Sequence, residues 1–471
     1  MIFNSFQFVW LFPLVFVVYW AMYKLFDRKG MTVTKYYLLA VSYGVYLQWS
    51  FFGGIILLVV SFVSYATALL IDRYRNYRRA IVAGGIVATL IPLFIFKYFN
   101  FITQAGASVF QWIGIDAAPP ALMWVVPLGL SFYSFQAVGY VADVYRNKIK
   151  AEKNIPDFLL FLSFFPQILC GPISTASELL PQIKNLRDFD YSRAVCGLRM
   201  ILWGLFLKTV LADRLGLYVD TIYGSPTGCS GSSALLAAIF YSLQIYGDFG
   251  GYSYMAVGVA RMLGIDLIIN FRRPYLAQSV SGFWKRWNIS LTRWLTQYVY
   301  ISLGGNRRGS IRTYINILVT FLVSGIWHGA NWTFLIWGLF HGVAQVIEKF
   351  IGLNKLESHG LTRLVRTVIT FTVVTFAWIY FRSPSISFAN HFIAGIFTDW
   401  GTLYINQNVF FHAAIAIAIV AMVEIWREFG RKSSDALMRS TVLRWSCYIG
   451  LTIMILGAGV LDSGQFIYIQ F

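Results

Sequence analysis

Two histidines lie in apolar sequence where membrane-spanning segments are expected. His328 ends the tract LVSGIWH (322–328), and His341 lies in WGLFHG (337–342). An ionisable side chain at membrane depth is costly, so it usually faces an internal cavity or pathway. The chain has five histidines in 471 residues, and the chemistry available to these two is the starting point for function.

A neutral imidazole can take a proton from a hydroxyl that attacks an acyl group. Burial disfavours the charged form and so keeps a histidine neutral and basic. His328 could alternatively attack the acyl group itself, and the sequence leaves both roles open. For His341, a supporting role competes with that of a structural histidine that is hydrogen-bonded between packed helices.

The two histidines are thirteen residues apart, which would place them on different faces of one helix. The tract 329–331 predicts a helix break between them. Whether the two side chains then meet stays open.

Asp248 is a third candidate, in the tract GDFGG (247–251). We predict a helix that is broken at these glycines and carries a carboxylate at membrane depth. The alternative is an aspartate that caps a helix resuming at Tyr252.

Other familiar chemistries are absent from the sequence. There is no HExxH, P-loop or GxSxG motif, and the four cysteines show no CxxC spacing. The histidines lack a third nearby ligand. We therefore expect no metal site and no bound cofactor.

Composition identifies the class of protein. The chain is 58% hydrophobic and 12% charged, against roughly 25% charged in soluble domains. Its net charge of +18 lies in short segments between apolar runs. This is the pattern of cytoplasmic loops, and it argues against a nucleic-acid partner. We expect one integral membrane domain over residues 1–471.

Apolar runs separated by these basic loops predict the topology. The expected spans are 6–23, 37–49, 55–71, 81–99, 122–141, 195–218, 234–245, 314–326, 332–347, 365–381, 410–423 and 445–460. The first has no basic segment before it and no cleavage site after it, so we interpret it as a retained span. If the basic loops lie in the cytoplasm and successive spans alternate in direction, this loop parity places both termini outside the cytoplasm.

Two segments do not fit simple spans. Residues 158–173 contain Pro166 and Pro172 between basic flanks, which predicts a re-entrant segment. Residues 271–308 mix arginine and tryptophan and predict interfacial helices. Two alternatives are open for them: an ordinary aromatic and basic belt, or a basic lining for an anionic, phosphate-rich thioester donor.

At this point the sequence resembles the membrane-bound O-acyltransferases, and within them the bacterial alginate O-acetylation branch. The resemblance rests on motifs that occur in order along most of the chain: FPQ (165–167) with GP (171–172), DFGGYS (248–253), NFRRPY (270–275), FWKRWNISL (283–291), YVYISLGGNR (298–307), WHGANW (327–332) and WGLFHG (337–342). Two departures are Thr296-Gln297, where many relatives have Arg-Asp, and Ser302, where proline is common.

The resemblance implies an all-α polytopic fold of about 11–12 transmembrane helices around a central tunnel, with re-entrant and interfacial helices. It implies that His328 is catalytic, with Asp248 and His341 in support. Donor-binding residues would be Trp284, Arg286, Asn288, Ser290, Trp327 and Asn331. The protein would be multi-pass in a bacterial inner membrane, among membrane lipid.

The C-terminal residues FIYIQF (466–471) resemble a terminal aromatic motif of this branch and of a small partner peptide in teichoic-acid D-alanylation. The resemblance implies that Tyr468 carries the acyl group as an ester. Loop parity separately places the tail 461–471 outside the cytoplasm. The alternative is an interfacial aromatic anchor.

The leading hypothesis is an O-acyltransferase that moves acetyl from a cytoplasmic thioester, expected to be acetyl-CoA, to hydroxyls of an extracytoplasmic polysaccharide. Transfer would pass through an extracytoplasmic SGNH-type partner. One rival is D-alanyl transfer from a carrier protein to teichoic acid, and a lipid or peptide acceptor is also open. A transporter or flippase is a rival of another class, although we see no pair of related halves.

Overall fold

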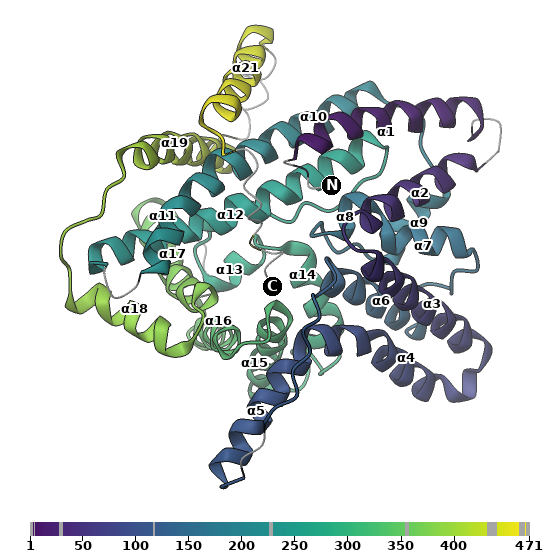
Figure 1. Ribbon diagram of the computed structural model, residues 1–471, viewed down its shortest axis with the longest axis horizontal. Helices are drawn as coiled ribbons and strands as arrows, with labels where there is room; N and C mark the ends of the chain where they lie inside the picture. Colours follow the sequence, from purple (N-terminus) through teal and green to yellow (C-terminus); the bar gives the residue numbers. More distant parts are fainter. Residues whose placement is uncertain are drawn as a thin grey trace. The chain divides into compact units, whose positions relative to one another are not determined.

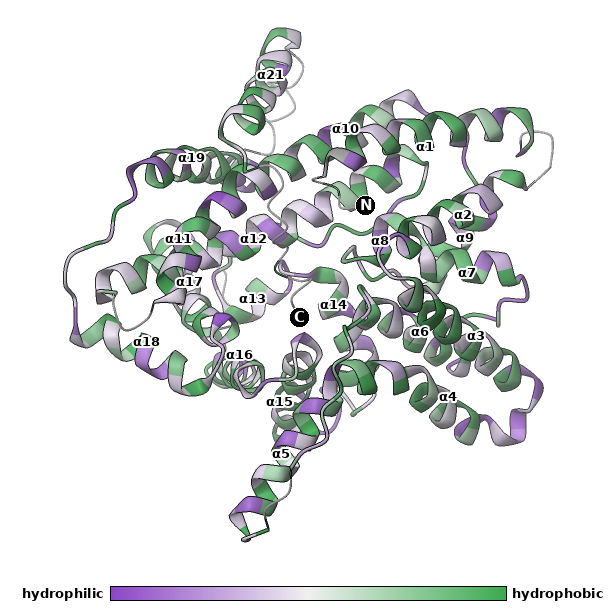
Figure 2. Cartoon of the chain, viewed as in Figure 1, coloured by the Kyte–Doolittle hydropathy of each residue, from purple (hydrophilic) through white to green (hydrophobic). Residues whose placement is uncertain are grey.

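The computed structural model describes residues 3, 5–27, 32–115, 118–225, 229–353, 358–430, 440–460 and 467. Within these residues the regular structure is helical, with no strand, which confirms the predicted all-α class. Eight helical segments in the described part are long and apolar enough to cross a membrane. Figure 2 shows apolar residues running along most of their length.

These eight segments coincide with eight of the twelve predicted spans. The other four predicted spans overlap the helices α2 (Val33–Leu47), α6 (Leu130–Tyr145), α12 (Gly231–Met262) and α16 (Trp332–Phe350). The predicted span 122–141 is helical only from Leu130. These four helices are shorter or more polar than the eight candidate membrane-spanning segments.

The chain packs into two compact units, one of Met1–Leu198 with Ala256–Ile268 and one of Arg199–Met255 with Ile269–Phe471. Two helices, α10 (Tyr191–Leu205) and α12, contribute residues to both. The prediction of one integral membrane domain stays a prediction.

The first unit is a helical assembly in which α3 packs on both α4 and α6 (Figure 1). Besides α2, α6 and its parts of α10 and α12, its helices are α1 (Phe6–Leu25), α3 (Phe51–Arg73), η2 (Arg75–Tyr77), α4 (Arg78–Leu93), η3 (Phe94–Tyr98), α5 (Phe99–Trp112), α7 (Ile155–Ser163), α8 (Phe165–Ile168) and α9 (Ala176–Lys184).

The predicted re-entrant segment is a broken helix. The chain forms α7 and α8 with a break at Phe164, and nearly all of its residues are buried. Ser42 Oγ accepts the backbone N–H of Phe165 at 3.2 Å, and Gln136 donates to the carbonyl of Phe161 at 2.8 Å. Irregular backbone at membrane depth needs such partners, so side chains of α2 and α6 stabilise the break.

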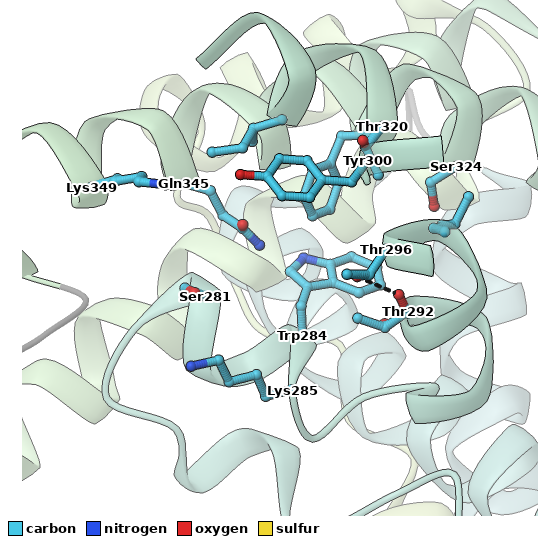
Figure 3. Close-up of a pocket in the computed structure, with 13 residues that line it drawn as sticks. Ser281, Trp284, Lys285, Thr292, Thr296, Tyr300, Thr320, Ser324, Gln345 and Lys349 are labelled. Carbon is cyan, nitrogen blue, oxygen red and sulfur yellow. Dashed lines mark hydrogen bonds between the residues drawn. The ribbon is translucent and has the colours of Figure 1, made fainter. Parts of the chain in front are cut away.

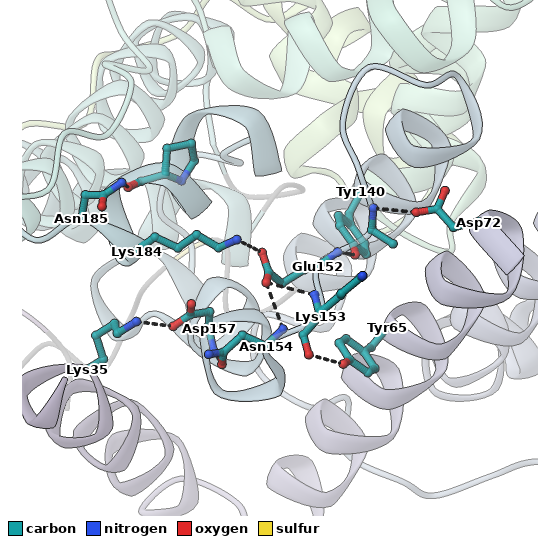
Figure 4. Close-up of polar contacts among 12 residues, drawn as sticks. Lys35, Tyr65, Asp72, Tyr140, Glu152, Lys153, Asn154, Asp157, Lys184 and Asn185 are labelled. Atoms are coloured by element: carbon teal, nitrogen blue, oxygen red, sulfur yellow. Dashed lines mark hydrogen bonds and ion pairs between the residues drawn. The ribbon is translucent and has the colours of Figure 1, made fainter. Parts of the chain in front are cut away.

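A polar network fixes the loop before α7 (Figure 4). Glu152 pairs with Lys184 at 2.5 Å and accepts the backbone N–H groups of Lys153 and Asn154 at 3.0 Å. Lys35 pairs with Asp157 at 2.9 Å. The loop is thereby joined to α2 and α9.

The second unit contains the remaining helices: η4 (Phe206–Ala212), α11 (Asp213–Gly224), η5 (Pro274–Leu276), α13 (Val280–Trp284), α14 (Ile289–Leu295), η6 (Thr296–Tyr300), α15 (Gly309–His328), α17 (Gly360–Arg382), α18 (Ile386–Thr398), α19 (Gln407–Phe429) and α21 (Thr441–Ala458), with α16 and its parts of α10 and α12.

Helix α12 corrects one prediction. It runs without interruption through residues 247–251, so the predicted break is wrong, and so is the alternative that Asp248 caps a second helix. A Cβ added at Gly251 would lie 2.7 Å from the carbonyl oxygen of Gly204 and 3.0 Å from the amide nitrogen of Lys208. The glycine therefore permits close helix packing, as small residues do between membrane helices.

The tract 271–308 forms the short helices η5, α13, α14 and η6. Its tryptophans Trp284, Trp287 and Trp294 are buried within the protein. A belt of tryptophans at the membrane surface is therefore wrong for these residues.

We expect Glu152→Ala to lower the free energy of unfolding by about 1–3 kcal/mol, because it leaves an ammonium and two amides without their acceptor. Thermal unfolding in detergent micelles measures this change. Asp188→Ala is the control, since Asp188 is exposed and accepts from the exposed Tyr23 hydroxyl at 3.2 Å. It should change stability by less than about 0.5 kcal/mol. Equal effects of the two variants would contradict the account.

Candidate active site

Helices α15 and α16 form a hairpin that carries both candidate histidines (Figure 1). The predicted break lies where it was expected, with α15 ending at His328 and α16 beginning at Trp332. A Cβ added at Gly325 would meet the carbonyl oxygen of Phe334, and one at Gly338 would meet that of Phe321. The two helices therefore touch through their backbones.

Trp337 lies between the two histidines. Its ring centroid is 4.9 Å from that of His328 and 5.1 Å from that of His341, with both pairs close to perpendicular. Trp337 also stacks on Trp378 of α17 at 5.6 Å. The histidines thus share one indole, and all four side chains are buried. This answers the question that the sequence left open, because the two imidazoles meet through a tryptophan.

Trp284 fixes the tautomer of His341. The indole N–H of Trp284 donates to His341 Nδ1 at 3.3 Å. A neutral imidazole has one protonated and one acceptor nitrogen, so in His341 the proton resides on Nε2. His341 Nε2 has no hydrogen-bond partner among the described residues, and the group is therefore a donor available to a bound molecule.

Glu348 positions the helix that carries Trp284. Its carboxylate accepts the backbone N–H groups of Val280, at 2.5 Å, and Ser281, at 2.9 Å, at the start of α13. Glu348 lies two turns after His341 on α16, on the same helix face. One helix therefore supplies a histidine and also holds the partner of that histidine. The sequence analysis missed Glu348, although an acidic residue in an apolar segment is a readable signal.

A cavity of about 300 Å³ opens beside this cluster (Figure 3). Lys285 and Lys349 lie at one end of it and Ser324 at the other. Ser324 precedes His328 by one helical turn on the same face of α15, and Trp284 forms part of the wall. Hydroxyl and amide groups supply most of the polar lining: Ser281, Thr292, Thr296, Tyr300, Thr320, Ser324 and Gln345.

Several buried polar atoms in this region have no hydrogen-bond partner within the part of the chain described: His341 Nε2, Trp337 Nε1, Ser324 Oγ and both side-chain polar atoms of Asn288. Such atoms are rare in folded proteins and call for an explanation. Water or a bound molecule would satisfy them.

The other predicted donor-binding residues have structural partners. Arg286 pairs with Glu428 at 3.2 Å, and Arg273 and Arg363 bind the same carboxylate. Asn331 accepts the Thr333 N–H as the N-cap of α16. The Ser290 N–H binds Asn270 Oδ1 at 3.1 Å. Trp327 is buried beside His328 at 4.8 Å. Their contact with a donor stays a prediction.

Asp248 belongs to a second polar centre. It pairs with Lys208 at 2.7 Å, and Lys208 also pairs with Asp213 at 2.6 Å. The other oxygen of Asp248 accepts the backbone N–H of Ile467. Lys208 could have been noticed as a lysine within an apolar run, with Asp213 five residues later, but its other partner, Asp248, lies forty residues away in the sequence. Tyr468 lies outside the described residues.

The chain is similar to known proteins over most of its length. A family model described as "MBOAT, membrane-bound O-acyltransferase family" matches residues 4–388. A probable alginate O-acetylase AlgI of Pseudomonas syringae pv. tomato is 34% identical over 429 residues, 89% of this chain and 80% of that protein. A peptidoglycan O-acetyltransferase of Helicobacter pylori is 33% identical over 84% of this chain and 80% of its own. A teichoic acid D-alanyltransferase of Bacillus subtilis is 27% identical over 66% and 82%.

We expect Gly338→Ala to lower the free energy of unfolding by about 1–3 kcal/mol, because the added methyl overpacks the contact between α15 and α16. Gly450→Ala in α21 is the matched control, since a Cβ there meets nothing within 4 Å. The control should be neutral or stabilise by up to about 1 kcal/mol. Unfolding in detergent micelles measures both, and a neutral Gly338→Ala would contradict backbone contact between the helices.

Proposed function

Because the chain belongs to the membrane-bound O-acyltransferase family, we propose that it transfers acetyl from a cytoplasmic thioester to hydroxyl groups of an extracytoplasmic polysaccharide. It is an O-acyltransferase and a multi-pass membrane protein with bacterial relatives. The observation that carries the finer proposal is the polar cavity that reaches from two lysines to the helical turn before His328.

His328 is the base in this proposal. Its neutral imidazole accepts the proton of an attacking hydroxyl while the hydroxyl oxygen bonds to the acyl carbon. The carbon–sulfur bond then breaks, and the thiolate leaves with the proton that the imidazole returns. The ester and the free thiol are the products, so atoms and charges balance.

His341 serves as a donor in the same reaction. Its Nε2–H is directed by the bond from Trp284 to Nδ1. Donors fixed before the reaction stabilise the oxygen on which negative charge develops. This division of roles, with one imidazole as base and the other as donor, follows from the tautomer of His341.

The donor enters, we propose, at the end of the cavity that carries Lys285 and Lys349. Acetyl-CoA is the expected donor because its phosphates suit two ammonium groups. A cavity of about 300 Å³ matches the lower end of the size range of small-molecule sites, roughly 300–1,000 Å³. It therefore favours a short acyl group.

On the acceptor side, we propose that Tyr468 receives the acetyl group and passes it to an SGNH-type partner outside the cytoplasm. The relatives with alginate and peptidoglycan in their names support a polysaccharide acceptor. D-alanyl transfer would be the outcome if the exported polymer carried D-alanine esters instead of acetate.

We expect His328→Ala to reduce ester-linked acetate on exported polysaccharide at least hundredfold, since a general base contributes roughly 10²–10⁴. The acetate released by mild alkali is measured at matched protein abundance. His391→Ala is the control, because His391 is an exposed histidine of α18 and its loss should leave acetate unchanged. Full acetylation in His328→Ala, with loss on gene deletion, would remove His328 from the chemistry.

We expect Lys285→Ala and Lys349→Ala each to raise KM for acetyl-CoA about threefold to fivefold with kcat unchanged, as for a partly exposed charge pair of up to about 1 kcal/mol. Initial rates on purified protein at low and high salt measure this, and the effect should shrink in high salt. Lys24→Ala, at the end of α1, is the control. An unchanged KM in the double variant would place the donor elsewhere.

A further inference from the structure

The helix η4 accepts a hydrogen bond from the chain that follows α21. It is a π-helix that contains Lys208 and Thr209. The wider turn of a π-helix displaces carbonyl groups from the regular ladder, and such turns are frequent at functional sites. The carbonyl of Thr209 accepts the backbone N–H of Val460 at 3.0 Å. The chain segment that follows α21 is thus attached to η4.

Two further contacts hold the same segment, residues 458–460. The guanidinium Nε of Arg214 donates to the carbonyl of Ala458 at 2.8 Å. A Cβ added at Gly459 would lie 3.1 Å from the hydroxyl oxygen of Thr209 and would collide with the carbonyl of Ile455. A residue larger than glycine at position 459 would therefore disturb the contact with η4 and α11.

A second attachment lies seven residues further along the tail, at the charged cluster of Lys208, Asp213 and Asp248. Asp248 Oδ2 accepts the backbone N–H of Ile467 at 2.8 Å, while Asp248 Oδ1 pairs with Lys208. The side chains of the cluster are 1–6% exposed, and Ile467 is 9% exposed. Val460 binds the carbonyl of Thr209 directly. Ile467 binds Asp248, which in turn pairs with Lys208, the residue before Thr209.

The cluster lies deep in the protein. Lys208 is at the middle of the 34-residue apolar segment Tyr191–Gly224, and Asp248 is near the middle of the 32-residue α12. Charged groups at such depth are costly and usually mark a functional site. The carboxylates of Asp213 and Asp248 offer more acceptor atoms than the Lys208 ammonium alone can use. The backbone N–H of Ile467 binds one of these atoms, Asp248 Oδ2.

We propose that Asp248, with Lys208 as its counter-ion, is a positioning residue that holds the chain after α21 at Ile467. The next residue along the chain is Tyr468, so this attachment at Ile467, which we call the seat, adjoins in sequence the residue proposed as the acyl relay. The consequence for acyl transfer rests on the proposed function of Tyr468, whereas the seat itself does not. Asp248 acts here through the tail and not on the reacting atoms.

The seat is tested by carboxypeptidase digestion of the full-length protein in nanodiscs, with mass spectrometry of the shortened chains. In the wild type, digestion should stop at or before Ile467. Asp248→Asn should speed removal of Ile467 at least tenfold, because the carboxylate and its ion pair are lost. Asp220→Asn is the matched control, since Asp220 pairs with Arg382 and both are about one third exposed. It should behave as the wild type.

Val460→Pro is the second variant, because it removes the N–H that binds Thr209 and leaves the charged cluster intact. It should also speed digestion, with the unfolding temperature of the bundle unchanged. If the wild-type tail is digested past Ile467 as fast as in Asp248→Asn, the seat does not exist. This result does not depend on activity.

The link to transfer has its own measurement. With labelled acetyl-CoA, Asp248→Asn should lower the label on the Tyr468 peptide at least tenfold while KM for acetyl-CoA stays constant. Asp248→Glu should retain part of the label that Asp248→Asn loses. A released tail with undiminished label would overturn the positioning role. Absence of label in the wild type would contradict the proposed relay and leave the digestion result standing.

Discussion

The close contact of α15 and α16 is the constraint on which the candidate site depends. Because Gly325 and Gly338 bring the two helices to backbone contact, one indole, that of Trp337, reaches both imidazoles. A wider separation would put a layer of side chains between them. In a membrane, where the hydrophobic effect does not drive helices together, such packing is the main source of association. The geometry of the histidines is thus a consequence of small residues about one helical turn away.

Two of the polar centres described in the second unit differ in character. Around the histidines, several buried donors and acceptors have no partner among the described residues, and a cavity adjoins them. Around Lys208, the charged groups are paired with each other and with a backbone N–H. A buried pair is stabilising only when its geometry and hydrogen bonds are complete. The first centre adjoins a cavity and is suited to a transient ligand, whereas the second is occupied by contacts within the chain.

Much of this could be predicted from sequence, for physical reasons that differ by residue. An imidazole in an apolar run identified His328 and His341, and the glycine after His328 located the helix break. The break at 247–251 was wrong because glycines in a membrane helix also serve packing, and α12 is continuous. Trp284 was predicted to bind the donor; it lines the cavity and also donates to His341, a contact that the sequence did not predict. Partners such as Lys208 for Asp248, and Glu348 for α13, depend on contacts across the fold that local sequence does not encode.

The bond from Trp284 to His341 has a consequence for the direction of proton movement. A histidine whose Nδ1 accepts a hydrogen bond presents a proton, and not a lone pair, at Nε2. It can stabilise a developing oxyanion but can remove a proton only after the indole bond is broken. Glu348 accepts the backbone N–H groups of Val280 and Ser281 at the start of α13, the helix that carries Trp284. This arrangement supports the proposal in which His341 is the donor and His328 is the base.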